Sequence, residues 1–252
     1  MRLILAGFLF LSFSCGKKTE NPPPTLEETG LTFSLDSLVR QSCAGENCAK
    51  LRLVWPVAKG DARAAKINEA IEGQLTSYLQ VGEEAGSELD AMAEFFFNTF
   101  EDFKTEVPDS FGAWEIEVKA ELSYESEHTI SIYFEQYNYL GGAHPNSSVD
   151  FLNFDKKTGE YLVRDRLILD EKKVRQLTEQ KFRIFHHVED EKSLEADDRF
   201  FLPEAGFFLA NAMGFREGRF WVVYVPYEIG PYALGYTELS FSKAEFDGLV
   251  NW

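Results

Sequence analysis

A run of alternating apolar and charged residues at positions 114–122 constrains the fold of this chain more than any other feature. Trp114 and the apolar residues after it occupy every second position, and a Glu or Lys stands at each position between them. Because successive side chains of a strand point to opposite faces, this period predicts a strand with one buried side and one charged side. A turn at residues 125–127 leads into residues 129–139, which are rich in Ile, Tyr and Phe and predict the returning strand.

Two segments of helical spacing come before this hairpin. Asp61 is a suitable N-cap for the first helix, while Ser87 and Pro108 mark the start and the end of the second. We expect the aromatic stripe of the second helix to pack on a sheet rather than to form a ligand groove. The residues expected to face inward are Ile67, Ile71, Leu75 and either Tyr78 or Leu79 in the first helix, and Leu89, Met92, Phe96, Phe100 and Phe103 in the second.

The C-terminal half of the sequence predicts one further helix and several strands. Ser242 and Glu245 have the spacing of a capping box for a short last helix. The third helix should begin at Asp170, with Val174, Leu177, Phe182 and Phe185 facing inward and with His186, His187 and residues 189–191 following in solvent. Further strands are expected at residues 51–57, 149–154, 160–163, 207–210, 219–227 and 237–241.

This order of elements is typical of the α+β class, in which helices segregate to one face of an antiparallel sheet. We therefore predict an α+β fold with an antiparallel sheet, helices packed on one face, and two intertwined subdomains.

The N-terminus resembles a bacterial lipoprotein signal. Residues 3–13 are apolar but too short to cross a bilayer, and Cys15 closes this run. We expect cleavage after residue 14, followed by acylation of Cys15 with fatty acids such as palmitate. Residues 15–30 are polar and contain three consecutive prolines, which predicts a semi-extended tether. This reading places the body outside the cytoplasm, in the bacterial cell envelope, with the membrane as a partner through Cys15; an ordinary secretory signal or an uncleaved anchor is the alternative.

The two other cysteines, Cys43 and Cys48, flank a turn-like stretch of four residues. In an exported chain they can close a disulfide, since the extracytoplasmic space is oxidising. Their spacing differs from the Cys-x-x-Cys motif of zinc and redox sites, so we predict a structural disulfide.

The chain is strongly acidic, with a formal net charge of -17. This charge disfavours nucleic acid and anionic lipid surfaces as partners and favours cationic proteins or peptides. Simple solubility is the alternative explanation of the acidity.

Two segments rich in Gly, Pro and Tyr carry a family resemblance. Residues 141–145 read Gly-Gly-Ala-His-Pro, and residues 226–232 read Pro-Tyr-Glu-Ile-Gly-Pro-Tyr. Together they resemble the bacterial envelope family called domain of unknown function 3298 (DUF3298). The earlier strand and helix, with the pair Ile67-Asn68, resemble its companion, domain of unknown function 4163. We therefore assign residues 31–125 to the companion-like domain and residues 126–252 to the DUF3298-like domain.

The resemblance implies a role in the cell envelope. These two domains occur together in the extracytoplasmic part of a lysozyme-sensing anti-sigma factor and beside peptidoglycan deacetylase domains. The present sequence shows neither a sigma-binding segment nor a deacetylase domain beside them.

Motifs for catalysis or cofactors are sparse in the sequence. The four histidines form no His-Glu-x-x-His motif, no Gly-x-Ser-x-Gly elbow is present, and no phosphate loop or dinucleotide fingerprint occurs. We therefore expect neither a metal nor a cofactor. The remaining chemical candidates are His144 in the glycine turn and Glu228 between two prolines; Glu228 can pair with His144 or cap backbone amides.

We therefore predict a non-catalytic binding module for a cationic, lysozyme-like protein or a cell-wall glycan. The alternative is a small envelope hydrolase that uses His144 with Glu228 or Asp150. The expected ligand-binding residues are Tyr133, Tyr137, Tyr139, His144, Tyr227, Glu228 and Tyr232.

Overall fold

The computed structural model describes residues 30–82, 86, 88–108, 110, 112–189 and 191–252. The predicted signal peptide, Cys15, the tether up to residue 29 and Ser87 lie outside the described residues. Within the described part, no helix is both long enough and apolar enough to cross a membrane.

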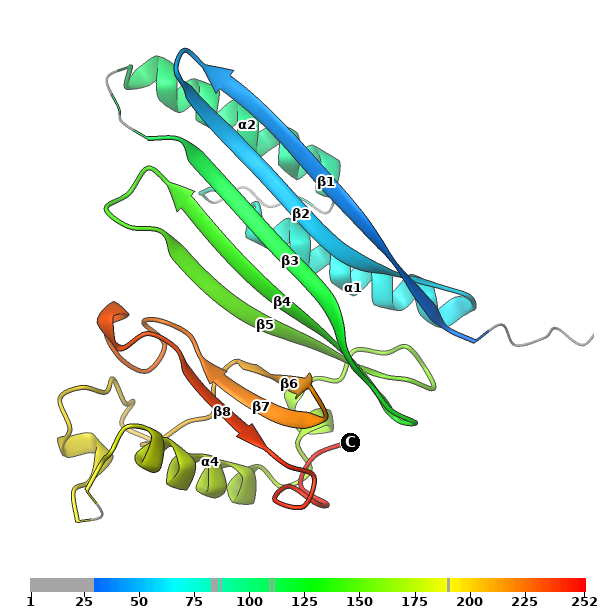
Figure 1. Cartoon of the computed structure of the whole chain (residues 1–252), viewed down its shortest axis with the longest axis vertical. Coiled ribbons are helices and arrows are strands. Elements are labelled where there is room, and N and C mark those ends of the chain that lie inside the picture. The colour runs from blue at the N-terminus through cyan, green and yellow to red at the C-terminus, as the bar shows by residue number, and fades with distance from the viewer. Residues whose placement is uncertain (1–29, 83–85, 87, 109, 111, 190) are drawn as a thin grey trace, which may run out of the picture.

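A five-stranded sheet forms the larger part of the molecule (Figure 1). Its strands follow chain order and are β1 (Thr32–Ala44), β2 (Asn47–Lys59), β3 (Trp114–Glu125), β4 (Thr129–Leu140) and β5 (Asn146–Asp155). All neighbours are antiparallel except β2 and β3, which are parallel. A parallel pair requires a crossover connection, and the two helices between β2 and β3 supply it.

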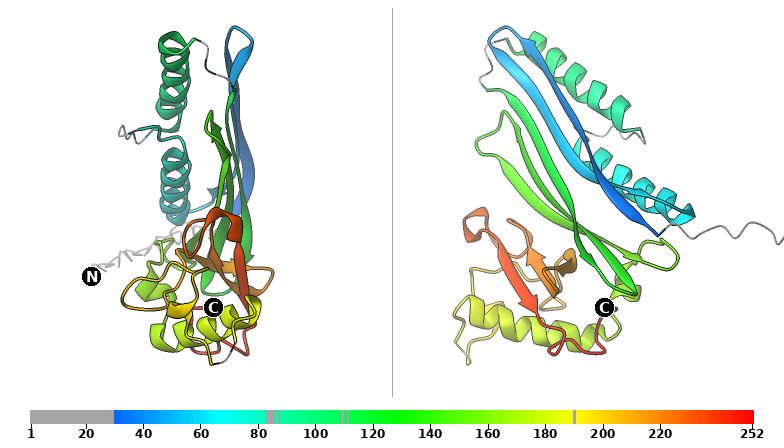
Figure 2. Two further views of the ribbon diagram at one scale, coloured as in Figure 1. Left: turned by 90° about the vertical axis from the view of Figure 1, so that its left-hand side faces the viewer. Right: turned by 45° about the vertical axis from the view of Figure 1, so that its right-hand side comes forward.

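Helices α1 (Ala62–Tyr78) and α2 (Leu89–Glu106) cover one face of this sheet (Figure 2). Asp61 caps α1, since its carboxylate accepts the N–H of Arg63 at 2.9 Å. The buried stripe of α1 and the aromatic stripe of α2 pack with alternate residues of β2, β3 and β4 in one apolar core. The predicted helices on one face are thus confirmed, while the opposite face of the sheet carries the charged side of β3.

A smaller three-stranded antiparallel sheet packs against β5, the edge strand of the large sheet, and against its neighbour β4 (Figure 1). Its strands are β6 (Ala212–Arg216), β7 (Arg219–Tyr224) and β8 (Thr237–Phe241). One face contacts the large sheet through an apolar cluster of Tyr133, Val149, Phe151, Ala212 and Val223. The other face is covered by α4 (Glu171–Phe185), and α3 (Arg164–Leu167) and the 3-10 turns Leu194–Ala196 and Tyr232–Leu234 complete this part.

A buried polar bridge joins the two sheets. The side chain of Asn153 donates to the carbonyl oxygen of Met213 at 2.9 Å, and the N–H of Phe215 donates to the hydroxyl of Ser131 at 3.2 Å. Ser131 donates to the side-chain oxygen of Asn153, so the two residues on β4 and β5 act as one unit. Ser123 on β3 adds a 2.7 Å bond to the carbonyl of Phe215.

Cys43 and Cys48 form a disulfide, as predicted. They are paired across the β1–β2 hairpin, next to its turn. Strand β1 was not expected from the sequence, so the disulfide closes the end of a long hairpin rather than an isolated loop.

Several local predictions are wrong. Residues 207–210 are buried but form no strand, and the strand lies instead at Ala212–Arg216. Phe185 is 47% exposed because it stands in the last turn of α4. His186 is buried against Thr237, at 2.8 Å between Nε2 and Oγ1, and burial lowers its pKa to about 4.

Two further predictions hold only in part. Ser242 and Glu245 make the capping-box contacts, but turns follow instead of a helix. Residues 160–163 contribute only one bridge, between Tyr161 and Phe154.

The large sheet contains strands from both sides of the predicted boundary at residues 125 and 126, since β3 and β4 are neighbours. The two buried cores, by contrast, lie on either side of the contact between the sheets. The division into residues 31–125 and 126–252 stays a prediction about sequence families.

The contact between the sheets depends on Gly214 of β6. A Cβ atom at this position would lie 2.5 Å from the ring of Phe151. We expect Gly214→Ala to lower the free energy of unfolding by about 1–3 kcal/mol through overpacking. Denaturant unfolding measures this change.

Gly73 in α1 is the matched control, because a Cβ there meets nothing within 4 Å. Gly73→Ala should raise stability by roughly 0.5–1 kcal/mol, since Gly disfavours a helix interior. Equal effects of the two substitutions would show that the sheet contact tolerates an added methyl group.

Candidate functional site

The main candidate site is a groove on the open face of the large sheet, on the side away from α1 and α2. It encloses about 490 Å³ between β3, β4, β5 and the start of β8. We call it the acidic groove and define it by its main side chains, which are Glu117, Lys119, Tyr133, Glu135, Tyr137, Tyr236 and Glu238.

Strand register brings these side chains together. Glu117 lies opposite Tyr137 and Lys119 lies opposite Glu135, so charged side chains and tyrosines are neighbours across the β3–β4 pair. The same pairing places the charged side of β3 next to the tyrosines of β4, because residues opposite each other share a face. The small sheet adds Glu238, which pairs with Val223 and therefore faces the large sheet.

Two carboxylates of the groove have no cationic partner among the residues that the structure describes. Glu117 pairs with Arg52 at 3.4 Å, and Lys119 pairs with Glu121 at 3.6 Å. Glu135 and Glu238 make no ion pair with any residue that the structure describes. The groove therefore contains negative charge that the described residues leave uncompensated.

This negative charge raises the pKa of two tyrosines in the groove. Burial raises the pKa of Tyr133, and the charges of Glu135 and Glu238 raise it further, while the nearby guanidinium of Arg216 partly opposes this increase. Burial also raises the pKa of Tyr236, and the same two glutamates add to the effect. All four side chains line the groove, so the tyrosines and the two carboxylates lie around the same space.

The predicted tyrosines of β4 occupy different environments. Tyr137 is 37% exposed and lines the groove, as a contact residue should. Tyr133 is only 4% exposed, stacks near Phe151 and lies under the guanidinium of Arg216, so it forms the floor rather than an exposed anchor. Tyr139 lies opposite Glu115 on the same face, beyond the groove lining.

His144 belongs to a separate aromatic cluster. Its exposed ring stacks on Tyr232 with 4.3 Å between ring centres, and its Nε2 atom lies 3.3 Å from the hydroxyl of Tyr227. Its Nδ1 atom lies 2.9 Å from the carbonyl oxygen of Pro145. Gly141 starts the turn with a φ of 82°, a conformation that glycine adopts without strain. The turn thus presents the imidazole to neighbouring tyrosines at the surface.

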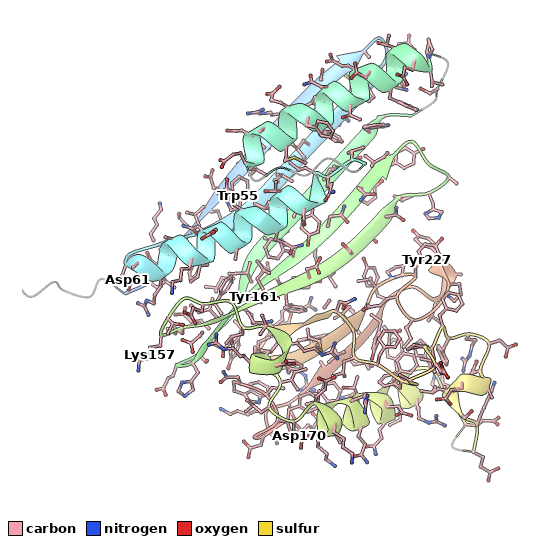
Figure 3. All side chains as sticks on the ribbon, turned by 180° about the vertical axis from the view of Figure 1, so that it is seen from behind. Trp55, Asp61, Lys157, Tyr161, Asp170 and Tyr227 are labelled. Carbon is pink, nitrogen blue, oxygen red and sulfur yellow. A yellow bond between two sulfur atoms is a disulfide. The ribbon has the colours of Figure 1, made fainter. Side chains whose placement is uncertain are left out.

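Glu228 organises the loop that carries Tyr227. Its carboxylate accepts the N–H of Asn211 at 2.7 Å and the N–H of Val225 at 3.0 Å. Tyr227 has a φ of 72°, which is unusual for a residue with a side chain. The carboxylate therefore fixes a strained turn, and Figure 3 places Tyr227 on this loop after β7. Of the two roles considered for Glu228, capping of backbone amides is the observed one.

Asp150 and Glu228 line a second cavity, of about 360 Å³, at the edge of β5. The hydroxyl of Tyr78 on α1 donates to Asp150 at 2.7 Å. Burial raises the pKa of both carboxyl groups, and for Glu228 the charge of Asp150 adds to the increase. This cavity shares Ser148 and Val149 with the acidic groove, so the two are neighbours around the edge of the sheet.

The sequence prediction thus grouped residues that the structure separates. His144, Tyr227 and Tyr232 form one cluster, Tyr133 and Tyr137 belong to the acidic groove, and Glu228 stands at the second cavity. Neither Glu228 nor Asp150 makes a described hydrogen bond to His144. The residues needed for the predicted hydrolase are therefore not assembled around one reacting group.

Five of the seven groove residues were not among the expected ligand-binding residues, namely Glu117, Lys119, Glu135, Tyr236 and Glu238. Glu135 has the same strand period as Tyr133 and Tyr137 and was open to detection on that ground. Tyr236 and Glu238 come from the small sheet, about a hundred positions later in the sequence, and no local pattern links them to β4. Among the described residues, no group of three or more His, Cys, Asp or Glu side chains is placed to hold a metal ion.

The buried carboxyl of Asp150 predicts a pH dependence of stability. A raised pKa in the folded state favours the protonated carboxyl, so its contribution to stability is present below the unfolded value of 3.8 and is lost as pH rises through the folded value. Asp150→Asn keeps an acceptor for Tyr78 but cannot ionise. Urea unfolding from pH 4 to 8 should show the variant gaining stability over the wild type as pH rises.

Asp102→Asn on the exposed surface of α2 is the control, and its difference from the wild type should not follow this trend. A constant difference between Asp150→Asn and the wild type across the range would contradict the assignment.

The comparisons with known proteins agree with this architecture. A sequence-family model described as "Deacetylase PdaC" matches residues 43–147. No curated protein matches the sequence. A DUF3298 family protein from Pseudomonas aeruginosa PAO1 has a similar crystal structure, with a TM-score of 0.64 and 17% identity, covering 89% of this chain and 96% of that one.

A second crystal structure, of a DUF3298 family member from Bacteroides fragilis NCTC 9343, gives a TM-score of 0.68 at 15% identity and covers 90% of this chain and 96% of that one. The two structures establish the fold, and the PdaC match covers the segment where the sequence suggested a domain found beside deacetylases. The predicted resemblance is therefore confirmed: the chain has the fold of DUF3298 family proteins, with a PdaC-like segment in its N-terminal part.

Proposed function

We propose that this chain is a non-catalytic binding module whose acidic groove receives a basic segment of a cationic protein. The observation that carries the proposal is the convergence of Glu135 and Glu238, both without a cationic partner among the described residues, on Tyr133 and Tyr236. A lysine or arginine side chain entering the groove gains both charges and at least one aromatic face.

The groove has the features of a specific contact rather than of general surface acidity. Its floor is the buried side chain of Tyr133, and charge interactions are stronger next to such a low-dielectric surface than in bulk water. Tyr137 and Tyr236 supply rigid apolar area with a polar tip, a combination enriched among residues that dominate binding energy. The remaining negative charge of the chain speeds encounter with a cationic partner.

A cell-wall glycan fits the groove less well. The tyrosines can stack on a sugar, but an uncharged sugar leaves Glu135 and Glu238 desolvated without a cation, which costs free energy. A cationic protein therefore matches more of the lining than a glycan does.

The hydrolase alternative has weaker support. The carboxylate of Glu228 is occupied by two backbone N–H groups, and Asp150 accepts the hydroxyl of Tyr78. His144 contacts two tyrosines and Pro145 instead of either carboxylate. A general base must reach the proton that it abstracts, and no described contact brings His144 to these acids.

We also propose that the module is attached to the cell envelope. The apolar run that ends at Cys15 and the proline-rich segment after it are the support for lipidation and for a tether. Attachment at a membrane suits a receptor for extracellular cationic proteins.

The groove is tested by titration with lysozyme, using calorimetry at low and high salt. Glu135→Gln combined with Glu238→Gln should raise the Kd by roughly ten- to a hundredfold, because the cation loses both partners. Tyr137→Ala should also weaken binding, and its effect should persist at high salt because it removes apolar contact.

The matched control is Glu69→Gln combined with Glu106→Gln, which changes the net charge equally on exposed helix surfaces away from the groove. A cationic non-enzymatic protein of similar charge serves as a second ligand. If both double variants weaken binding equally, or both ligands bind equally weakly, the acidity acts only as a diffuse field and the groove is not the site.

Lipidation is tested by Cys15→Ser. The wild-type protein should fractionate with membranes and carry acyl chains in its mass spectrum, while the variant should lose the acyl mass. A wild-type mass without acyl chains would overturn the anchor and leave the groove proposal intact.

A further inference from the structure

We propose that the solvent face of α4 docks onto a bilayer that contains anionic lipids. This helix is basic in a chain of net charge -17. It carries five basic residues against the two acidic residues Glu171 and Glu179. The whole-chain charge disfavoured anionic lipid as a partner, but the local charge of α4 has the opposite sign.

The cations at the start of α4 are available to a partner. Lys172, Lys173 and Arg175 are exposed, and none forms an ion pair with a residue that the structure describes. Lys181, further along the helix, pairs with Glu245 at 3.2 Å and so contributes less free charge. Each free Lys or Arg near an anionic bilayer adds to the attraction, and three of them lie within one turn of helix.

Apolar side chains share one side of α4 with Lys173, while Lys172 and Arg175 flank that side. Lys173, Leu177, Gln180 and Ile184 are spaced by three or four positions, so they form one stripe along the helix. Ile184 is 74% exposed, and hollows lie on both sides of it, next to Phe241 and next to Val188. An exposed apolar residue on the same helix face as a cation suits the boundary between lipid headgroups and acyl chains.

The position of α4 in the fold removes the main objection, which is repulsion of the acidic body. Helix α4 covers the face of the small sheet that points away from the large sheet, and it lies at the outer end of the molecule (Figure 2). The acidic groove lies on the other face of the small sheet. Because salt screens exposed charges beyond about 10 Å, the bilayer would interact mainly with the helix that touches it.

The predicted anchor makes a weak contact effective. Fifteen residues separate Cys15 from Leu31, where the folded body begins, and such a segment spans at most about 50 Å when extended. A tether of this length holds α4 at high local concentration near the membrane. Docking through α4 would then leave the acidic groove directed away from the bilayer, toward a soluble partner.

The experiment uses the full chain, purified from membranes and reconstituted into vesicles with brominated acyl chains that quench fluorescence. A fluorophore on Gln176→Cys reports contact of α4 with lipid, and one on the exposed Ser37→Cys reports a position in β1, the edge strand of the large sheet away from the small sheet. We expect quenching at position 176 in vesicles with phosphatidylglycerol, little in pure phosphatidylcholine, and little at position 37 in either.

Lys172→Gln, Lys173→Gln and Arg175→Gln together should lower the ratio of docked to undocked molecules about a hundredfold, since each basic residue contributes severalfold. The control removes equal charge elsewhere, through Lys50→Gln, Lys59→Gln and Lys157→Gln, and should leave the ratio within about twofold. Salt at 1 M should abolish the anionic-lipid effect in the wild type.

Two results would overturn the proposal. Equal quenching in neutral and anionic vesicles would mean that the anchor alone sets the distance. Absence of quenching at position 176 in anionic vesicles would also overturn it, and self-association that the α4 substitutions abolish would then assign this face to a second copy of the chain. Glu135→Gln with Glu238→Gln should leave docking intact, so failure of the groove proposal is distinguishable from failure of this one.

Discussion

The placement of the two sheets depends on the buried polar bridge through Ser131 and Asn153. Both residues are almost completely buried, and each is hydrogen-bonded to the backbone of β6. A buried polar group that loses its partner costs about 1–3 kcal/mol, and a shift of β6 by one residue would break both bonds to its backbone. Apolar contacts such as Phe151 against Gly214 tolerate little movement but specify no register. The polar bridge therefore selects one arrangement among those that the apolar surface alone would permit.

That arrangement creates the acidic groove. With β6 held against β4 and β5, the far strand β8 comes to lie over the charged side of β3 and β4. Tyr236 and Glu238 then complete a site of which the large sheet supplies only one wall. The cations near this face are paired with other glutamates: Arg52 with Glu117, Lys119 with Glu121, and Arg216, which lies over the ring of Tyr133, with Glu217. A groove with this charge at the junction of two sheets is a consequence of register, and a change at the bridge should alter it without any substitution in its lining.

The sequence predicted elements whose periodicity is decided by burial on one side. Residues 114–122 and both N-terminal helices have an apolar side facing one core, and they were assigned correctly. Strand β1 was not predicted because it is an edge strand in which no residue is fully buried. Its sequence therefore shows little alternation of apolar and polar residues. Residues 207–210 were wrongly predicted as a strand because they are apolar. Their apolar character reflects burial in a loop, in which the carbonyl oxygen of Phe208 accepts the hydroxyl of Tyr224. Only part of the groove could be predicted from the sequence. Tyr137 follows a strand period, whereas tertiary packing alone brings Glu238 of the small sheet to the same groove.

The small sheet separates two surfaces of opposite charge. Its inner face supports Glu238 and the tyrosines of the groove, and its outer face supports the cations of α4. Strand alternation makes this separation possible, because Glu238 and the buried Leu239 of the same strand point to opposite sides. In an anionic field such a molecule has a preferred orientation, with α4 toward the negative surface and the groove away from it. A receptor held on a short tether gains from this geometry, since thermal rotation would otherwise turn its binding site toward the membrane for part of the time.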